Sequence, residues 1–169
     1  VEQVAQMARN LRVGPGAENA ELTPVISSGQ LRGIEAMCQR AQAQGARVVA
    51  GGEALSGTTG NYMQPTVFCD VTPDMEIASS EVFGPVLGVM PFDDEEAVIE
   101  LANDNRYGLA ASLWTNDLSK AMNLVPRIEA GTVWINAHVL LDPAMPFGGV
   151  KQSGMGREFG RAVIEAFTE

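Results

Sequence analysis

Apolar residues recur at helical spacing in two stretches near the start of the chain. The first covers residues 1–11 and stops before the Gly-Pro-Gly sequence at 14–16. The second runs from about residue 30 to residue 44, with Ser28 as a candidate N-cap and Gly45 at its C-terminal end. Because serine caps helix starts, and glycine or proline ends helical patterns, both stretches are predicted to be amphipathic helices.

Shorter apolar runs follow, and they are rich in β-branched and aromatic residues. They predict strands at 47–50, 65–71, 85–90, 109–114 and 131–135. Helical spacing returns between and after the later strands, at 94–103, 117–128 and 157–167. Strands that alternate with helices of this length are typical of a parallel sheet covered on both faces. We therefore predict an α/β fold with three layers, in which a mainly parallel sheet carries helices on both faces.

The stretch from residue 136 to residue 160 is a long predicted loop, rich in glycine and proline, that ends near the last helix. A loop of this length inside a compact domain is more often functional than idle. We therefore expect functional residues within it.

The composition narrows the classes of partner. Of the 169 residues 46% are hydrophobic, which is enough for one domain with a core or for part of a larger domain. The 21 acidic and 11 basic residues give a net charge of -10, which repels phosphate backbones and anionic lipids. Nucleic-acid and membrane partners are therefore not expected. Cys38 and Cys69 are the only cysteines, they form no CxxC motif, and their number is far below that of a disulfide scaffold. This fits a reducing compartment, so a cytoplasmic location is expected.

Several familiar chemical motifs are ruled out by spacing or by residue type. The sequence GMGREFG at 154–160 has GxGxxxG spacing instead of GxGxxG, and no strand directly precedes it. His138 is the only histidine, which leaves no histidine-based metal site and no supported Ser-His-Asp arrangement. Cys38 lies on a helical apolar stripe and Cys69 lies in a strand pattern, so both are interpreted as small hydrophobic residues. We predict neither a catalytic residue nor a metal site in this chain.

Two short motifs admit both a structural and a functional interpretation. In SEVFGP at 80–85, Glu81 and Phe83 fit a surface carboxylate and a core aromatic as well as a binding site. The sequence PFGG at 146–149 also fits a simple turn with an aromatic plug. His138 fits a loop or subunit-contact residue better than a catalytic one. The residues by themselves leave the function open.

Four longer strings decide between these interpretations. They are EVFGPV at 81–86, NRYGLA at 105–110, GTVWIN at 131–136 and PFGGVKQSG at 146–154. In this order and at these separations they resemble the aldehyde dehydrogenase superfamily across essentially the whole chain. Residues 136–147, with LLDP at 140–143, are most similar to phenylacetaldehyde dehydrogenases.

The resemblance implies that an aldehyde is oxidised to a carboxylic acid with NAD or NADP as the cofactor. In the family, the glutamate matching Glu81 binds the hydroxyls of the nicotinamide ribose, and the phenylalanine matching Phe83 packs beside the nicotinamide. A carboxylate suits the first role because it can accept two hydrogen bonds, and an aromatic ring suits the second because it limits where the nicotinamide lies.

The resemblance also implies where the aldehyde binds. In the family, the loop before PFGG lines the aldehyde channel, so Leu141 and Phe147 are expected in the substrate pocket, with Asn136 and His138 nearby. Apolar walls there would desolvate the aldehyde and select an aromatic or aliphatic side chain. Phenylacetaldehyde is the expected type of substrate.

The chain is expected to be one part of a larger catalytic domain. The family attacks the aldehyde with a cysteine thiolate and hydrolyses the thioester with water activated by a glutamate. Residues 1–169 match the C-terminal portion of that domain, so the dinucleotide-binding half and the catalytic cysteine segment are expected to be absent. We expect the isolated chain to be inactive and to self-associate, and the full-length protein to be a homo-oligomer, either a dimer or a tetramer.

A second hypothesis comes from a different class of protein. The chain would then be a free-standing interaction or assembly module that keeps the fold and performs no chemistry. The mass of the native protein discriminates between the two, because the enzyme requires a much longer chain with an upstream cysteine motif.

Overall fold

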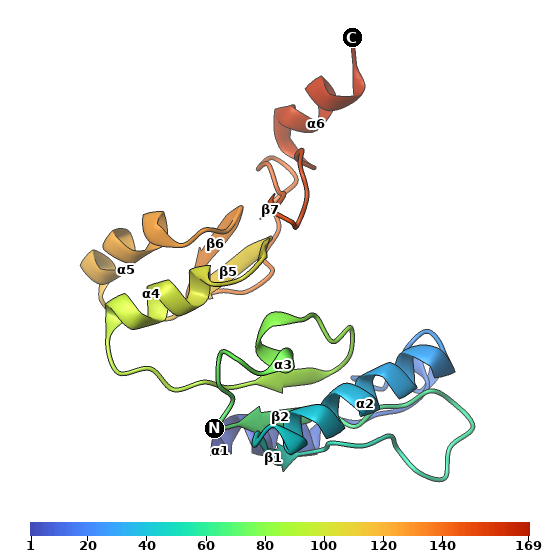
Figure 1. Ribbon diagram of the computed structural model, residues 1–169. Coiled ribbons are helices and arrows are strands. Elements are labelled where there is room, and N and C mark those ends of the chain that lie inside the picture. The colour runs from blue at the N-terminus through green and yellow to red at the C-terminus, as the bar shows by residue number, and fades with distance from the viewer. The chain divides into compact units, whose positions relative to one another are not determined.

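The computed structural model describes residues 1–169, which divide into two units, Val1–Pro91 and Phe92–Glu169. The first unit contains α1 (Glu2–Asn10), the 3-10 turn η1 (Gly16–Glu18), α2 (Ser28–Ala43), β1 (Arg47–Ala50), β2 (Thr66–Cys69), α3 (Glu76–Ser79) and β3 (Val86–Gly88). Its strands form one sheet in the order β1-β2-β3, of which β1 and β2 are labelled in Figure 1.

The sheet of the first unit lies between α1 and α2 (Figure 1). Successive side chains of a strand point to opposite faces of a sheet. Val67 of β2 packs with Ala5 and Ala8 of α1, whereas the next residue, Phe68, packs with Ile34 of α2. The two helices therefore cover opposite faces, and this unit has three layers, as predicted.

Helix α2 begins one residue earlier than its predicted cap allows. Ser27, which has an extended backbone, accepts a hydrogen bond at 3.1 Å from the backbone N–H of Gln30. Ser28 is already helical, so its prediction as the N-cap was wrong by one position. The apolar stripe of the helix is confirmed, because Ile34 and Cys38 are fully buried.

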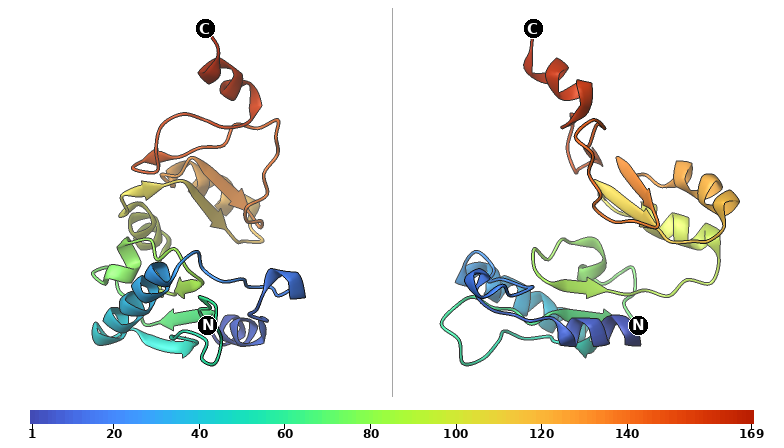
Figure 2. Two further views of the ribbon diagram at one scale, coloured as in Figure 1. Left: turned by 90° about the vertical axis from the view of Figure 1, so that its right-hand side faces the viewer. Right: turned by 180° about the vertical axis from the view of Figure 1, so that it is seen from behind.

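The second unit contains α4 (Glu95–Asn103), β4 (Tyr107–Gly108), β5 (Ala110–Leu113), α5 (Leu118–Leu124), the 3-10 turn η2 (Val125–Arg127), β6 (Thr132–Ile135), β7 (Val150–Lys151) and α6 (Gly160–Phe167). Strands β5 and β6 are parallel neighbours connected through α5, the crossover that parallel pairing requires (Figure 2). Ion pairs join α4 to α5 and η2, between Glu95 and Lys120 and between Glu96 and Arg127.

The α/β prediction is confirmed, but the strand pairing is mixed. Pairs β2–β3 and β5–β6 are parallel, whereas β1–β2 and β4–β7 are antiparallel. Strands β1 and β2 are joined by residues 51–65, which contain no helix and return the chain in the opposite direction. A long connection without a crossover helix therefore produced the antiparallel pair that the sequence pattern did not predict.

Two helix boundaries differ from the predicted ones for local reasons. The helix predicted at 117–128 ends at Leu124 and continues as η2, where Pro126 has no N–H to donate. The last helix begins at Gly160 instead of residue 157, because the backbone before it pairs Glu158 with Phe147. Strands β4 and β7 and helix α3 were not predicted, since two to four residues are too few to show a period. None of the helices combines the length and apolar character needed to cross a membrane.

Lys151 joins the end of α4 to the β4–β7 pair. Its ammonium group donates to the carbonyls of Asn103 at 2.7 Å and Asn105 at 3.1 Å, and it forms an ion pair with Glu129 at 2.6 Å. The side chain is only 24% exposed. All three ammonium donors therefore have acceptors, one of them a carbonyl at the negative end of a helix dipole.

We predict that Lys151→Met lowers the free energy of unfolding of the complete protein by about 2 kcal/mol, because it removes charged hydrogen bonds from partly buried carbonyls. Urea titration followed by circular dichroism measures this change. The chain offers Lys120→Met as a matched control, because Lys120 is more exposed and pairs with a single carboxylate, Glu95. A loss as large in the control as in Lys151→Met would contradict the prediction.

Candidate functional site

Phe83 is an exposed aromatic residue on a strained backbone, in the segment between α3 and β3. Its side chain is 70% exposed and its φ angle is 53°. A bulky residue with positive φ is rare, and such conformations persist only where neighbouring groups impose them. Because burial does not explain this conformation, a functional role becomes the better interpretation of Phe83.

Helix α2 imposes the conformation of this segment. The side-chain amide of Gln30 donates hydrogen bonds to the carbonyl oxygens of Val82 at 3.2 Å and Phe83 at 3.0 Å. The next residue, Gly84, lies so close to α2 that a Cβ atom there would be 2.4 Å from Cδ1 of Ile34. A polar contact and a steric contact thus fix the backbone on both sides of the Phe83 side chain.

Glu81 lies two residues before Phe83 and is also exposed. Its carboxylate makes no hydrogen bond or ion pair within the chain, unlike the neighbouring Glu76, which pairs with Arg40 at 2.6 Å. The structure therefore presents a free carboxylate and a free aromatic ring from one rigidly held segment. This arrangement suits a ligand that carries both hydroxyl groups and a flat ring.

Trp134 brings several of the expected pocket residues together in the second unit. Its indole N–H donates to the carbonyl of Leu140 at 2.8 Å. Its ring centroid lies 5.9 Å from that of His138, edge-on, and 6.4 Å from that of Phe147. Nδ1 of His138 lies 2.8 Å from the hydroxyl of Ser112 on β5. The long loop is therefore folded around an aromatic group at the end of β6.

Asn136 and Leu141 differ from His138 and Phe147 in their surroundings. The amide of Asn136 is occupied by the backbone of Thr115, since its Oδ1 accepts at 2.9 Å and its Nδ2 donates at 2.8 Å. Leu141 is 42% exposed on the loop, next to the carbonyl that Trp134 holds. Asn136 thus joins the chain segments after β5 and β6, whereas Leu141 has an apolar surface free for contact.

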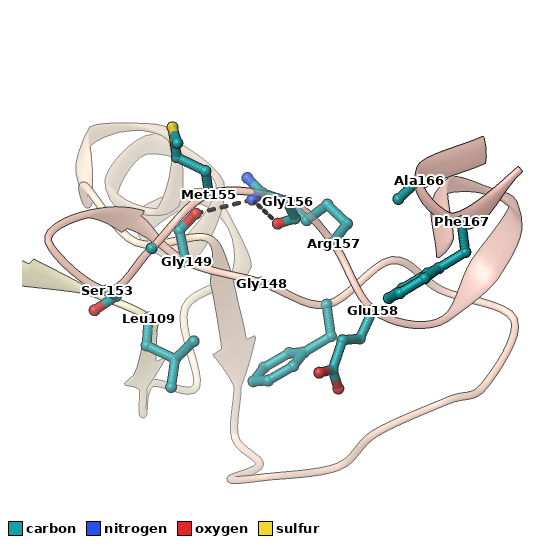
Figure 3. A pocket seen from close by; sticks show the side chains of 12 residues that line it. Leu109, Gly148, Gly149, Ser153, Met155, Gly156, Arg157, Glu158, Ala166 and Phe167 are labelled. Atoms are coloured by element: carbon teal, nitrogen blue, oxygen red, sulfur yellow. Dashed lines mark hydrogen bonds between the residues drawn. The ribbon is translucent and has the colours of Figure 1, made fainter. Parts of the chain in front are cut away.

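The PFGG segment is held between the start of β6 and residues 156–158. Phe147 and Glu158 exchange two backbone hydrogen bonds, of 2.8 and 2.7 Å. A Cβ atom on Gly131, just before β6, would lie 1.7 Å from the carbonyl oxygen of Gly148. A hollow of about 450 Å³ lies beside this segment, with Phe147, Arg157 and Phe167 among its lining residues. Figure 3 shows it from close by and labels Arg157 and Phe167.

The two groups of expected site residues belong to different units of the chain. Glu81 and Phe83 lie in the first unit, and the aromatic group around Trp134 lies in the second. Sequence reasoning missed Gln30 and Trp134 as residues that position these groups. Gln30 is one of many polar residues on an amphipathic helix, so only the three-dimensional contact identifies it. Trp134 lies in the GTVWIN string, and the available signal was the indole N–H, a hydrogen-bond donor on an aromatic residue of a predicted strand.

Both cysteines are buried and lack the character of nucleophiles. Burial, with a smaller contribution from the nearby charge of Glu35, raises the pKa of Cys38 to about 11. Burial also raises the pKa of the Cys69 thiol, and its hydrogen bond with Asp70 acts in the same direction. Since the thiolate is the reactive form, neither thiol is activated at neutral pH. No group of three or more His, Cys, Asp and Glu side chains is arranged to hold a metal ion.

These features define an α/β protein that presents a free carboxylate and aromatic rings on loops fixed by its strands and helices. A family model described as the aldehyde dehydrogenase family matches residues 1–169. The chain belongs to the aldehyde dehydrogenase family, as the four sequence strings predicted.

Known relatives support the assignment along the whole chain. The chain is 46% identical over 168 residues to a betaine aldehyde dehydrogenase of Cereibacter sphaeroides, covering 99% of this chain and 35% of that protein. It is 41% identical over 170 residues to the putative aldehyde dehydrogenase DhaS of Bacillus subtilis, covering 34% of that protein. The chain therefore spans about a third of the length of the curated relatives it matches.

Solved structures give the same result for the fold. The NAD+ complex of an aldehyde dehydrogenase from Bacillus cereus matches with a TM-score of 0.95 and 43% identity, over 99% of this chain and 34% of that one. The NAD+ complex of a Mycobacterium tuberculosis aldehyde dehydrogenase matches with a TM-score of 0.93 and 43% identity, over 98% and 35% of the two chains. The phenylacetaldehyde branch suggested by residues 136–147 does not appear among these relatives.

We predict that Gly131→Ala lowers the free energy of unfolding of the complete protein by about 3 kcal/mol, because a Cβ there would overlap the Gly148 carbonyl and push PFGG off β6. Gly33→Ala is the matched control, since a Cβ at Gly33 in α2 has no neighbour within 4 Å. That control is expected to raise stability by about 0.5–1 kcal/mol, because alanine favours the helix. Urea titration of both variants measures these changes. The prediction requires the two changes in the free energy of unfolding to have opposite signs.

Proposed function

We propose that the complete protein oxidises an aldehyde to a carboxylic acid with NAD+ or NADP+, and that this chain contributes residues that position the cofactor and line the aldehyde pocket. The observation that carries the proposal is the Phe83 segment. It keeps a large aromatic ring exposed on a positive-φ backbone and places it two residues from an unpaired carboxylate. The strained backbone lowers the stability of the fold, but it presents the aromatic ring and the carboxylate to a ligand.

The free groups of the first unit fit a nicotinamide riboside. The Glu81 carboxylate can accept hydrogen bonds from both ribose hydroxyls, and it has no partner within the chain that competes for them. The exposed Phe83 ring offers an apolar contact that limits where the nicotinamide ring can lie. When bound, the nicotinamide accepts a hydride. Gln30 keeps both contacts in register because it holds the backbone between them.

The second unit offers an apolar aromatic wall for the aldehyde. Trp134, His138 and Phe147 stand together at the end of β6, and Leu141 adds an exposed apolar side chain. Such a wall excludes water from the carbonyl group and favours a substrate with an aromatic or long aliphatic side chain. We propose phenylacetaldehyde as a representative substrate.

A second type of substrate is favoured by the relatives. The betaine aldehyde dehydrogenase of Cereibacter sphaeroides is 46% identical to this chain, and the aldehyde in its name carries a quaternary ammonium group. Aromatic faces attract such cations through their ring quadrupoles. Trp134 and Phe147 would then contact the cation of the substrate instead of an apolar side chain.

The covalent chemistry is proposed to belong to residues outside positions 1–169. The family uses a cysteine thiolate, and the two thiols present here are buried and have raised pKa values. We propose that this chain is the C-terminal portion of the catalytic domain, that the dinucleotide-binding half lies elsewhere, and that the complete protein forms a homo-oligomer. Exposed apolar residues such as Met7 and Phe167 supply surface for those contacts.

We predict that the complete protein reduces NAD+ or NADP+ when supplied with phenylacetaldehyde or betaine aldehyde, and that the isolated 169-residue chain does not. Absorbance of the reduced cofactor measures both outcomes. A preference for betaine aldehyde would select the cationic substrate over the aromatic one. Absence of turnover with every aldehyde would reject the oxidoreductase and favour a non-catalytic assembly module.

We predict that Glu81→Gln raises the KM for the cofactor about tenfold, because an amide accepts fewer and weaker hydrogen bonds from hydroxyls than a carboxylate does. The exposed position means that thermal stability is expected to stay unchanged. Glu53→Gln is the control, since Glu53 is an exposed carboxylate in the same unit but distant in sequence from Phe83. Equal cofactor KM values for Glu81→Gln and the wild type would remove Glu81 from the cofactor site.

A further inference from the structure

The Arg157 side chain binds backbone carbonyls instead of a carboxylate. Its Nη1 donates to the carbonyl oxygens of Gly149 at 2.8 Å and Gly156 at 2.7 Å, and these hydrogen bonds are the dashed lines in Figure 3. The residue is half-buried and forms no ion pair within the chain. An arginine used in this way acts as a cross-link between two chain segments, because its planar group holds both carbonyls at once.

The cross-link closes a layered arrangement around PFGG. On one side, the Gly148 carbonyl touches Gly131 at the start of β6 so closely that no Cβ fits between them. On the other side, a Cβ on Gly148 would lie 2.8 Å from Cδ of Arg157. The glycine pair is therefore confined between β6 and the arginine. Phe147 is the residue directly before this confined pair, so its backbone is anchored at the same contact.

Phe147 is held by contacts with residues on both sides of it in the sequence. Two backbone hydrogen bonds pair it with Glu158, next to Arg157. Its ring lies 6.4 Å from that of Trp134. The carbonyl of the buried Gly149 receives its hydrogen bond from Arg157, and loss of that donor would leave a polar atom without a partner.

We propose that Arg157 is a positioning residue for the aldehyde pocket, because its guanidinium holds residues 147–149 against residues 156–158 and thereby sets the Phe147 ring beside Trp134. This inference rests on the proposed function, in which Phe147 lines the pocket. Arg157 does not touch the substrate. It acts through the backbone, so its effect depends on how far an aldehyde extends toward Phe147.

The expected kinetic result is a change that depends on substrate size. In the complete protein, Arg157→Met is expected to raise the KM for phenylacetaldehyde about tenfold and to leave the KM for acetaldehyde and for the cofactor within about twofold, because a displaced ring disturbs only substrates that reach it. Arg157→Lys is expected to recover part of the loss, since an ammonium can still reach one carbonyl. Arg161→Met is the matched control, because Arg161 pairs only with the exposed Glu165.

Hydrogen exchange provides a readout that does not require turnover. The amide hydrogens of Phe147 and Glu158 are expected to exchange about ten times faster in Arg157→Met, while those of β6 keep their protection. Unchanged exchange at both amides, or equal KM changes for large and small aldehydes without rescue by lysine, would overturn the inference. Faster exchange in a protein that oxidises no aldehyde would support the cross-link and reject the proposed function, so the two failures are distinguishable.

Discussion

The two hydrogen bonds from Gln30 to the carbonyls of Val82 and Phe83 are the constraint on which the proposed cofactor contact depends. A backbone at positive φ does not hold itself, because the alternative conformations of a phenylalanine are lower in energy. Helix α2 offsets this conformational energy through the side-chain amide of Gln30 and through the steric contact of Ile34 with Gly84. Because α2 packs in the core, this support is rigid. Phe83 therefore keeps its conformation as long as the first unit stays folded.

In the second unit, too, side-chain donors hold loop carbonyl groups in place, but different residues supply them. Its loops lack ladder partners for many carbonyl groups, and polar side chains supply the missing donors. Trp134 holds Leu140, Asn136 holds Thr115, and Arg157 holds Gly149. These donors lie 6, 21 and 8 residues along the chain from the carbonyls that they bind. Residues 136–149 are therefore held in place without a helix or strand of their own.

Helices and strands with a repeating pattern of apolar residues could be predicted from the sequence. Contacts between those elements could not. Periodicity identified α2 and β5–β6, and the family strings identified Glu81 and Phe83 as candidates. Periodicity could not identify β4 and β7, which are two residues long, or the antiparallel turn-back of residues 51–65. The string GMGREFG lacks the spacing of a dinucleotide motif, and nothing in its residue types predicts that Arg157 binds the Gly149 carbonyl.

Phe68 and Phe83 show how one residue type lies in the core at one position and at the surface at another. Phe68 lies on β2, is fully buried against α2, and contributes the hydrophobic free energy of a core aromatic. Phe83 is 70% exposed although it stands beside the same helix. A chain selected only for stability would place a polar residue there, because an exposed ring on a strained backbone lowers stability and promotes association. The exposed ring, together with the contacts that fix it, is the strongest physical reason to propose that this segment binds a ligand.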